Sequence, residues 1–114
     1  MNSKASTGLL LGRFQPFHDG HRALALEIIA RDGQVCFAVR DTGGTDAKNP
    51  YDFLAVRDRI VVEMADQAGK FRILQVPNIT TVYYGRDVGY TIEQLNLSPE
   101  LQAISATRIR AGGV

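Results

Sequence analysis

The sequence predicts an open α/β fold with a mostly parallel sheet. Short apolar runs of strand length alternate with longer segments in which apolar residues recur at helical spacing. A strand, a helix and a second strand follow one another within residues 7–40, which indicates a βαβ unit with parallel strands and a right-handed crossover. The 114-residue length suits a single domain. We therefore expect one domain over residues 1–114, with helices on both faces of the sheet.

The first three elements follow from local patterns. The apolar run 7–12 ends in glycine and predicts a buried strand. Residues 18–31 have helical period, and Pro16 precedes them as a residue that often stands where a helix begins. The expected apolar stripe of this helix comprises His21, Leu24, Ala25 and Ile28. Residues 34–40 predict the second strand.

The second half of the chain is expected to hold another helix and two more strands. Residues 52–68 predict the helix, and its apolar stripe comprises Phe53, Val56, Ile60 and Met64. The run 71–77 predicts a third strand, and the run 79–85, rich in β-branched and aromatic residues, predicts a fourth. Weaker signals indicate one or two helical turns within 92–97 and a strand end turning into a short helix within 104–113.

Composition and charge narrow the class of protein. The formal net charge is +1, which offers no overall electrostatic attraction to nucleic acid or to a membrane surface. Cys36 is the only cysteine, so no internal disulfide forms, and no Cys/His spacing indicates a structural zinc site. We expect no metal site built by the protein. With no signal-peptide pattern and no apolar stretch long enough for a bilayer, we expect a cytoplasmic location.

The segment GRFQPFHDGH, residues 12–21, brings polar chemistry to the end of the first strand. Ligands of open parallel sheets bind beyond the carboxyl ends of the strands, where strand order reverses, so we expect residues 7–12 to form a central strand. The following helix N-terminus offers unpaired N–H groups and a positive dipole end, which suit phosphate. His18 and His21, three residues apart, would lie on one face of the first turns, and Arg13 adds a positive charge.

A structural role for the two histidines is the alternative. His18 would then cap the helix, and His21 would be a core histidine with its hydrogen bonds satisfied. The expected position of Gly12, Arg13 and Gln15 on the same rim as the two histidines favours a ligand site instead. Gly12 and Gly20 add positions where a ligand can approach the backbone closely.

Three segments carry a resemblance to a known family. GRFQPFHDGH resembles the HxGH signature of the nucleotidyltransferase superfamily (cytidylyltransferase-like), in the long form of nicotinamide mononucleotide adenylyltransferases. ISATRIR, residues 104–110, is similar to the superfamily's ISSTxxR motif, with alanine for the second serine. Between them, residues 48–59 resemble the asparagine-proline-aromatic segment that precedes the second helix in many members. The order of the three motifs matches the family and covers most of the chain.

This resemblance implies a Rossmann-like sheet and a chemistry. A nucleoside monophosphate, AMP from ATP in the first instance, would pass to a phosphorylated small-molecule acceptor, with pyrophosphate leaving and Mg²⁺ bound to the substrate. The resemblance implies catalytic roles at the phosphates for His18, His21 and Arg110. The nucleotide-binding residues that it implies are Gly12, Arg13, Phe14, Gln15, Gly20, Ser105 and Thr107. Possible acceptor or loop contacts are Lys48, Asn49, Arg57, Tyr84 and Arg86.

Several alternatives stay open at this point. The nucleotide could be CTP, or the chain could be a nucleotide-binding module without activity. Loop 41–50 has two equally weighted interpretations. It could be a mobile loop that closes over phosphates, with Lys48 as the cation, or a polar loop that only connects two elements. Arg57 stands one residue away from the family's arginine, which puts its role in doubt. Members usually continue with further helices beyond Arg110, and the open flank left here favours a homo-oligomer, a dimer first of all.

Overall fold

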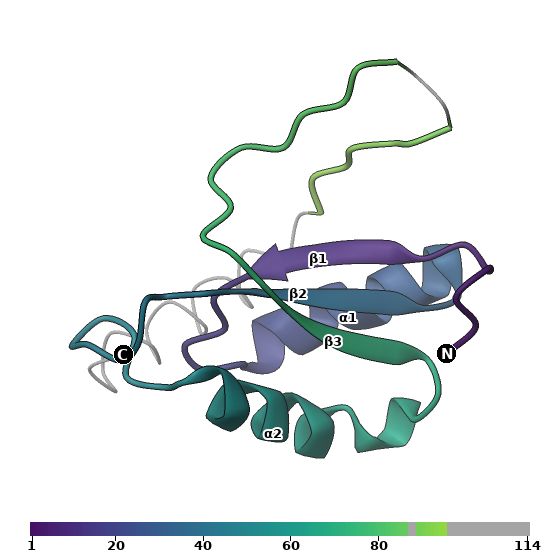
Figure 1. Cartoon of the computed structure of the whole chain (residues 1–114). Coiled ribbons are helices and arrows are strands. Elements are labelled where there is room, and N and C mark those ends of the chain that lie inside the picture. Colours follow the sequence, from purple (N-terminus) through teal and green to yellow (C-terminus); the bar gives the residue numbers. More distant parts are fainter. Residues whose placement is uncertain (87–88, 96–114) are drawn as a thin grey trace.

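A computed structural model of the chain describes residues 1–86 and 89–95. It holds a parallel three-stranded sheet and two α-helices that alternate along the chain (Figure 1). The elements are β1 (Gly8–Gly12), α1 (Asp19–Asp32), β2 (Val35–Arg40), α2 (Phe53–Glu63), the short 3₁₀ helix η1 (Ala65–Gln67) and β3 (Phe71–Val76). The open α/β fold that the sequence predicts is confirmed. The expected second helix divides at Met64 into α2 and η1.

The two helices cover one face of the sheet. Strand order is β1-β2-β3, with Gly8 opposite Val35 and Val35 opposite Phe71, so both right-handed crossovers step in the same direction (Figure 1). On the other face, the side chains of Leu9 and Leu74 are 64% and 46% exposed. The helices expected on that face do not occur within residues 1–86 and 89–95.

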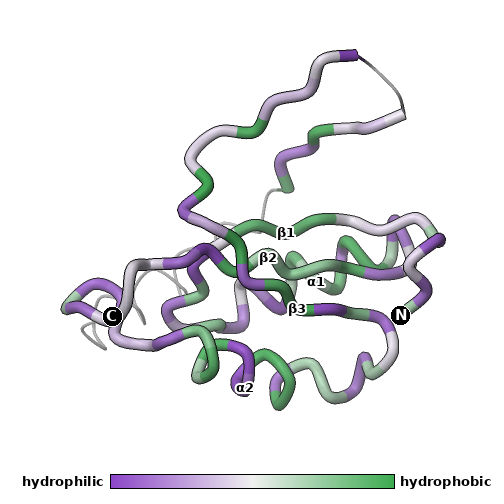
Figure 2. Tube along the Cα trace, in the orientation of Figure 1, coloured by the Kyte–Doolittle hydropathy of each residue, from purple (hydrophilic) through white to green (hydrophobic). Residues whose placement is uncertain are grey.

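The core lies between the sheet and the two helices. Its centre is the fully buried Phe37 of β2, and Figure 2 shows β1 as hydrophobic along most of its length. The helical residues buried against the strands are Ala25, Ile28, Val56, Ile60 and Met64. Ala25 and Ile28 of the first predicted stripe and Val56, Ile60 and Met64 of the second therefore face the core, whereas His21, Leu24 and Phe53 are half-buried.

The expected fourth strand is wrong. Residues 79–85 leave the sheet as an extended segment without strand pairing, and this segment projects from the body (Figure 1). Hydrophobic residues are interspersed along it (Figure 2), yet Val82 is 63% exposed and Tyr83 is 87% exposed. A strand is stabilised by its cross-strand neighbours, and β-branched residues alone do not supply them.

Two related expectations also change. Because no fourth strand pairs with β1 in the described part of the chain, β1 forms an edge of this sheet and β2 its centre. The prediction of a central first strand is therefore wrong for these residues, and the argument from a reversal of strand order loses its basis. The carboxyl-end argument remains, because Gly12 still ends a parallel strand. Residues 92–95 are not helical, and 96–97 and 104–113 lie outside the described residues.

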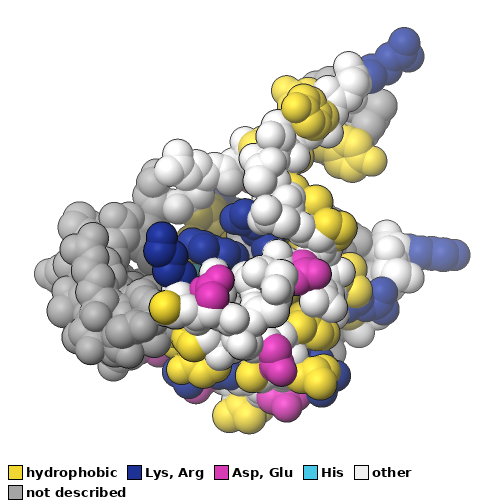
Figure 3. All heavy atoms as spheres, turned by 60° about the vertical axis from the view of Figure 1, so that its left-hand side comes forward, with side chains coloured by type: hydrophobic (Ala, Val, Ile, Leu, Met, Phe, Trp, Pro, Cys, Tyr) yellow, Lys and Arg dark blue, Asp and Glu magenta, His cyan; other side chains and the backbone are white. Residues whose placement is uncertain are grey.

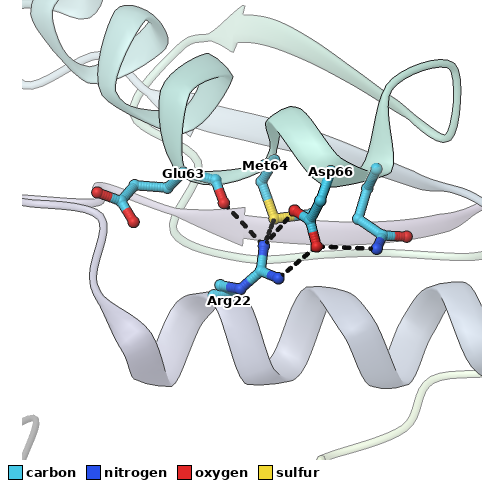
Figure 4. Close-up of polar contacts among 5 residues, drawn as sticks. Arg22, Glu63, Met64 and Asp66 are labelled. Carbon is cyan, nitrogen blue, oxygen red and sulfur yellow. Dashed lines mark hydrogen bonds and ion pairs between the residues drawn. The ribbon is translucent and has the colours of Figure 1, made fainter.

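An ion pair ties α1 to the end of α2 (Figure 4). Two nitrogens of Arg22 donate to the carboxylate oxygens of Asp66 at 2.8 and 2.6 Å, and Arg22 Nη1 also donates to the carbonyl oxygen of Glu63 at 2.7 Å. The hydrogen bond from Arg22, with a second from Gln67, lowers the pKa of Asp66 to about 2. This ion pair therefore stays charged at acidic pH and connects the two helical segments.

No helix among the described residues is long and apolar enough to cross a membrane.

The backbone of β1 approaches α1 closely at Gly8. A Cβ atom there would overlap Cγ2 of Ile28, which is buried, and would lie 3.1 Å from an oxygen of Asp32. We expect Gly8→Ala to lower the free energy of unfolding by about 1–3 kcal/mol, the usual effect of overpacking a core. Urea unfolding measures it. Gly85→Ala is the matched control, because a Cβ there meets nothing within 4 Å. Equal midpoints for Gly8→Ala and wild type would show that α1 shifts away at no cost.

Candidate functional site

The first turn of α1 is held by its own histidines. His18 is the N-cap residue, and its Nδ1 accepts the backbone N–H of Gly20 at 3.0 Å. The backbone N–H of His18 in turn donates to Nδ1 of His21 at 3.2 Å, which completes a capping box. The two imidazole rings stack with centroids 3.8 Å apart. Because each ring accepts at Nδ1, each neutral ring carries its proton on Nε2.

The capping role and a ligand role are therefore compatible. Capping uses Nδ1 of His18 and of His21, whereas an Nε2–H group is the part of a neutral imidazole that can donate to a phosphate oxygen. The structural alternative weighed from the sequence is present, since His18 does cap the helix. Capping through Nδ1 also fixes the Nε2–H tautomer, which is the tautomer that can donate to a ligand.

His21 is kept neutral by its surroundings. Its ring stacks on Phe17 at a centroid distance of 5.6 Å and meets Phe14 edge-on at 4.9 Å. This burial, with a smaller contribution from the charge of His18, lowers the pKa of His21 from 6.5 to about 3. At neutral pH His21 is thus an uncharged hydrogen-bond donor.

The turn between β1 and α1 is built on Phe14. Its backbone has φ +53°, a left-handed conformation that costs energy for a bulky residue, and its ring is buried against Phe17 and Phe37. A Cβ at Gly12 would lie 3.1 Å from the Phe14 ring, a tight contact that the ring would have to relieve by a small shift. The turn continues through a cis peptide bond between Gln15 and Pro16.

The segment 48–59 contacts the segment 12–21. The side-chain amide of Gln15 donates to the carbonyl oxygen of Tyr51 at 2.8 Å and accepts the Tyr51 N–H at 2.9 Å. Arg13 Nη1 donates to the side-chain oxygen of Asn49 at 3.4 Å. Asn49 is buried, and its backbone N–H donates to Asp46 at 2.7 Å. Two segments that are far apart in the sequence, and that the resemblance singled out, therefore meet at one edge of the sheet.

A hollow of about 330 Å³ opens at the carboxyl ends of β2 and β3, beside the first turn of α2. Figure 3 views the molecule from this side and shows a group of Lys and Arg side chains with Asp or Glu side chains beside it. The residues that line it are Gln15, Val39, Arg40, Asp41, Thr42, Gly44, Tyr51, Asp52, Phe53, Leu54, Val56 and Gln75. Among these lining residues, Gln15 is the only one that the sequence analysis named as a candidate site residue.

Arg40 is the cationic residue that the sequence analysis missed. It is the last residue of β2, and its Nη2 donates to the side chain of Asn78 at 2.6 Å. Its Nε is buried and has no hydrogen-bond partner among the described residues. A charged residue that closes an otherwise buried strand at the binding edge of a parallel sheet is a signal that could have identified it.

Other candidate residues lie elsewhere. Arg57 pairs with its neighbour Asp58 at 3.0 Å on the exposed side of α2. Tyr84 and Arg86 are exposed on the segment that projects from the body (Figure 1). Lys48 is exposed in loop 41–50, where its backbone N–H donates to Asp46. Three further candidates lie outside the described residues: Ser105, Thr107 and Arg110.

A protein-built metal centre does not occur in the described part of the chain. Residues 1–86 and 89–95 contain no group of three His, Cys, Asp or Glu side chains close enough to hold an ion. The hollow is lined by one cation, Arg40, and by the carboxylates of Asp41 and Asp52, and Arg13 adds a second cation directly after β1. The two arginines are the groups that suit an anionic ligand.

Comparisons with known proteins support the fold. No protein-family model and no curated protein sequence matches the chain. Among solved structures it is similar to a bifunctional NMN adenylyltransferase/ADP ribose pyrophosphatase from Francisella tularensis, with TM-score 0.59 and 22% identity over 64% of this chain and 22% of that one. A second structure of this Francisella protein, complexed with AMP and Mn ion, gives TM-score 0.52 and 23% identity over 64% of this chain and 23% of that one. The chain thus spans less than a quarter of these neighbours and has the Rossmann-like α/β fold of that part of them.

Proposed function

We propose that this chain is a nucleotidyltransferase domain that transfers AMP from ATP to a phosphorylated small molecule. The observation that carries the proposal is the stacked pair His18 and His21 at the N-terminus of α1, with Nδ1 of each ring engaged in capping. The likeness to the Francisella structures supports it, one of which was solved with AMP and Mn ion. Arg13 adds a fixed positive charge directly after β1.

The chemistry is an in-line displacement. A phosphate oxygen of the acceptor attacks the α-phosphorus of ATP, the bond to the bridging oxygen breaks, and pyrophosphate leaves with that electron pair. Negative charge grows on the phosphoryl oxygens, and the Nε2–H groups of the histidine pair stabilise it. A neutral imidazole can donate these hydrogen bonds at neutral pH without gaining or losing a proton. No covalent intermediate with the protein forms.

The other nucleotide contacts follow from the same placement. Phe14 and Gly20 are buried and the N–H of Gly20 donates to His18, so Gly12 is the position where a ligand would approach the backbone, and Gln15 holds the turn against Tyr51. The triphosphate tail would be bound by Ser105, Thr107 and Arg110. Mg²⁺ would arrive with the triphosphate and neutralise part of its charge, since Mg²⁺ keeps several waters and binds through substrate phosphates.

The acceptor would occupy the hollow at the carboxyl ends of β2 and β3. Its volume of about 330 Å³ lies within the range of small-molecule sites, and Arg40 supplies a cation for the acceptor phosphate. Loop 41–50 forms part of its wall and carries Lys48 and Asn49. Arg57, Tyr84 and Arg86 are further candidate contacts for the acceptor.

Nucleotide-dependent thermal stabilisation tests the first half of this proposal. ATP with Mg²⁺ should raise the melting temperature more than CTP or GTP with Mg²⁺. At ~100 times its dissociation constant, a ligand adds about 2.7 kcal/mol to the folded state. The largest rise with CTP would assign the domain to cytidylyl transfer, and no rise with any nucleotide would contradict the proposal.

Pyrophosphate release tests the second half. ATP and Mg²⁺ should yield pyrophosphate only when a phosphorylated acceptor is present, and nicotinamide mononucleotide is the first acceptor to try. Arg40→Met should raise the KM for the acceptor and leave the KM for ATP unchanged. ATP binding without pyrophosphate release, over a panel of phosphorylated nucleosides and sugars, would favour a binding module.

A further inference from the structure

Arg59 of α2 reaches the chain segment immediately before α1. Its Nε donates to the backbone carbonyl oxygen of Phe17 at 2.7 Å. Phe17 is fully buried and directly precedes the N-cap residue His18. The side chain of Arg59 therefore links the second motif segment, 48–59, to the first, and Arg57 of the same segment contacts Asp58 instead.

The same peptide group is bonded on both sides. The carbonyl of Phe17 and the N–H of His18 belong to one planar unit, which moves as a rigid body. Arg59 donates to the oxygen of this unit, and the nitrogen of the unit donates to Nδ1 of His21. A positive donor on the oxygen polarises the amide and strengthens its N–H as a donor. The guanidinium is thus connected to the His21 ring through one peptide group.

We infer that Arg59 is a positioning residue, which fixes the orientation and the Nε2–H tautomer of His21 through the peptide group between Phe17 and His18. Its effect on turnover rests on the proposed function, whereas its effect on the tautomer does not. Without Arg59 the peptide group can rotate away from His21, and the ring then has no fixed acceptor role at Nδ1. A ring that samples both tautomers presents its donor to a ligand for only part of the time.

The direct test is nitrogen NMR of the histidine rings at neutral pH. Wild type should show His21 with its proton on Nε2. Arg59→Met keeps the unbranched apolar stem without a donor, so the His21 signals should move to those of a tautomer mixture. Arg59→Gln places an amide N–H₂ at the position of the lost Nε and should restore the wild-type signals.

Arg22→Met is the matched control. Arg22 also crosses from one helix to the other and donates to a backbone carbonyl, that of Glu63, but this contact lies at the end of α2 away from Phe17. It should cost stability and leave the His21 tautomer unchanged. An unchanged tautomer in folded Arg59→Met overturns the inference. If Arg59→Met does not fold, wild type still decides, because a proton on Nδ1 of His21 excludes the bond from the His18 amide.

Turnover provides the second readout. In the pyrophosphate assay, Arg59→Met should lower kcat by about 10- to 100-fold, the effect of a slightly misplaced catalytic group, with little change in the KM for ATP. A higher KM for ATP with unchanged kcat would mean that Arg59 binds the nucleotide itself, which contradicts a positioning role. Absence of turnover in wild type would refute the proposed function and leave the NMR result to stand alone.

Discussion

His21→Asn should lower turnover by about 10²–10³-fold, the usual cost of losing one donor to a transition-state oxyanion. Asparagine retains an acceptor at the position of Nδ1, so the capping box with His18 persists, but it offers nothing in place of Nε2–H. Because the donor acts on charge that grows during transfer, the dissociation constant of ATP should change far less than kcat.

His21→Gln is the complementary variant. Its amide N–H₂ lies at the position of Nε2, whereas the acceptor for the His18 amide is lost. It should be less stable than His21→Asn and turn over faster. The same pair of substitutions at His18 separates capping of Gly20 from donation to the ligand.

Pyrophosphate release at saturating ATP and acceptor gives kcat, and calorimetric titration gives the dissociation constant of ATP. Urea unfolding ranks the variants by stability. Wild-type turnover in folded His21→Asn would show that the ring only caps the helix and packs in the core. Slow turnover in both His21→Asn and His21→Gln, with ATP binding intact, would show that both ring nitrogens matter.

Local patterns predicted most of the fold because burial enforces them. The expected helix 18–31 is observed as Asp19–Asp32, and the stripe that includes Ala25 and Ile28 faces the core. The run 79–85 has the same local character as a strand but no neighbour to pair with in the described residues. Strand formation depends on that neighbour, so local composition could not decide it.

The candidate site was predictable in its location and not in its connections. Spacing alone placed His18 and His21 together at the first turn of one helix. The contacts of Gln15 with Tyr51 and of Arg59 with Phe17 join residues 36 and 42 positions apart, and no local pattern encodes them. Arg57 was singled out by its place in a motif, yet the direction of a helical side chain decides its contacts.

Wild type should lose stability as the pH falls from about 6.5 toward 3, through His21. In the unfolded chain this imidazole binds a proton near pH 6.5, and in the folded protein its pKa is lowered to about 3. Between these values the unfolded state binds more protons, so the stability present above pH 6.5 decreases progressively on acidification. A shift of this size corresponds to at most about 5 kcal/mol.

Urea unfolding between pH 7 and pH 4.5 measures this slope. His21→Asn, which keeps the cap and cannot titrate, should show a flatter dependence, whatever its absolute stability. Asp66 does not interfere, because it is common to both proteins and its lowered pKa affects stability only below about pH 5. Parallel curves for His21→Asn and wild type would mean that His21 protonates as freely in the folded chain as in the unfolded one. A neutral Nε2–H donor at this turn would then have no physical basis.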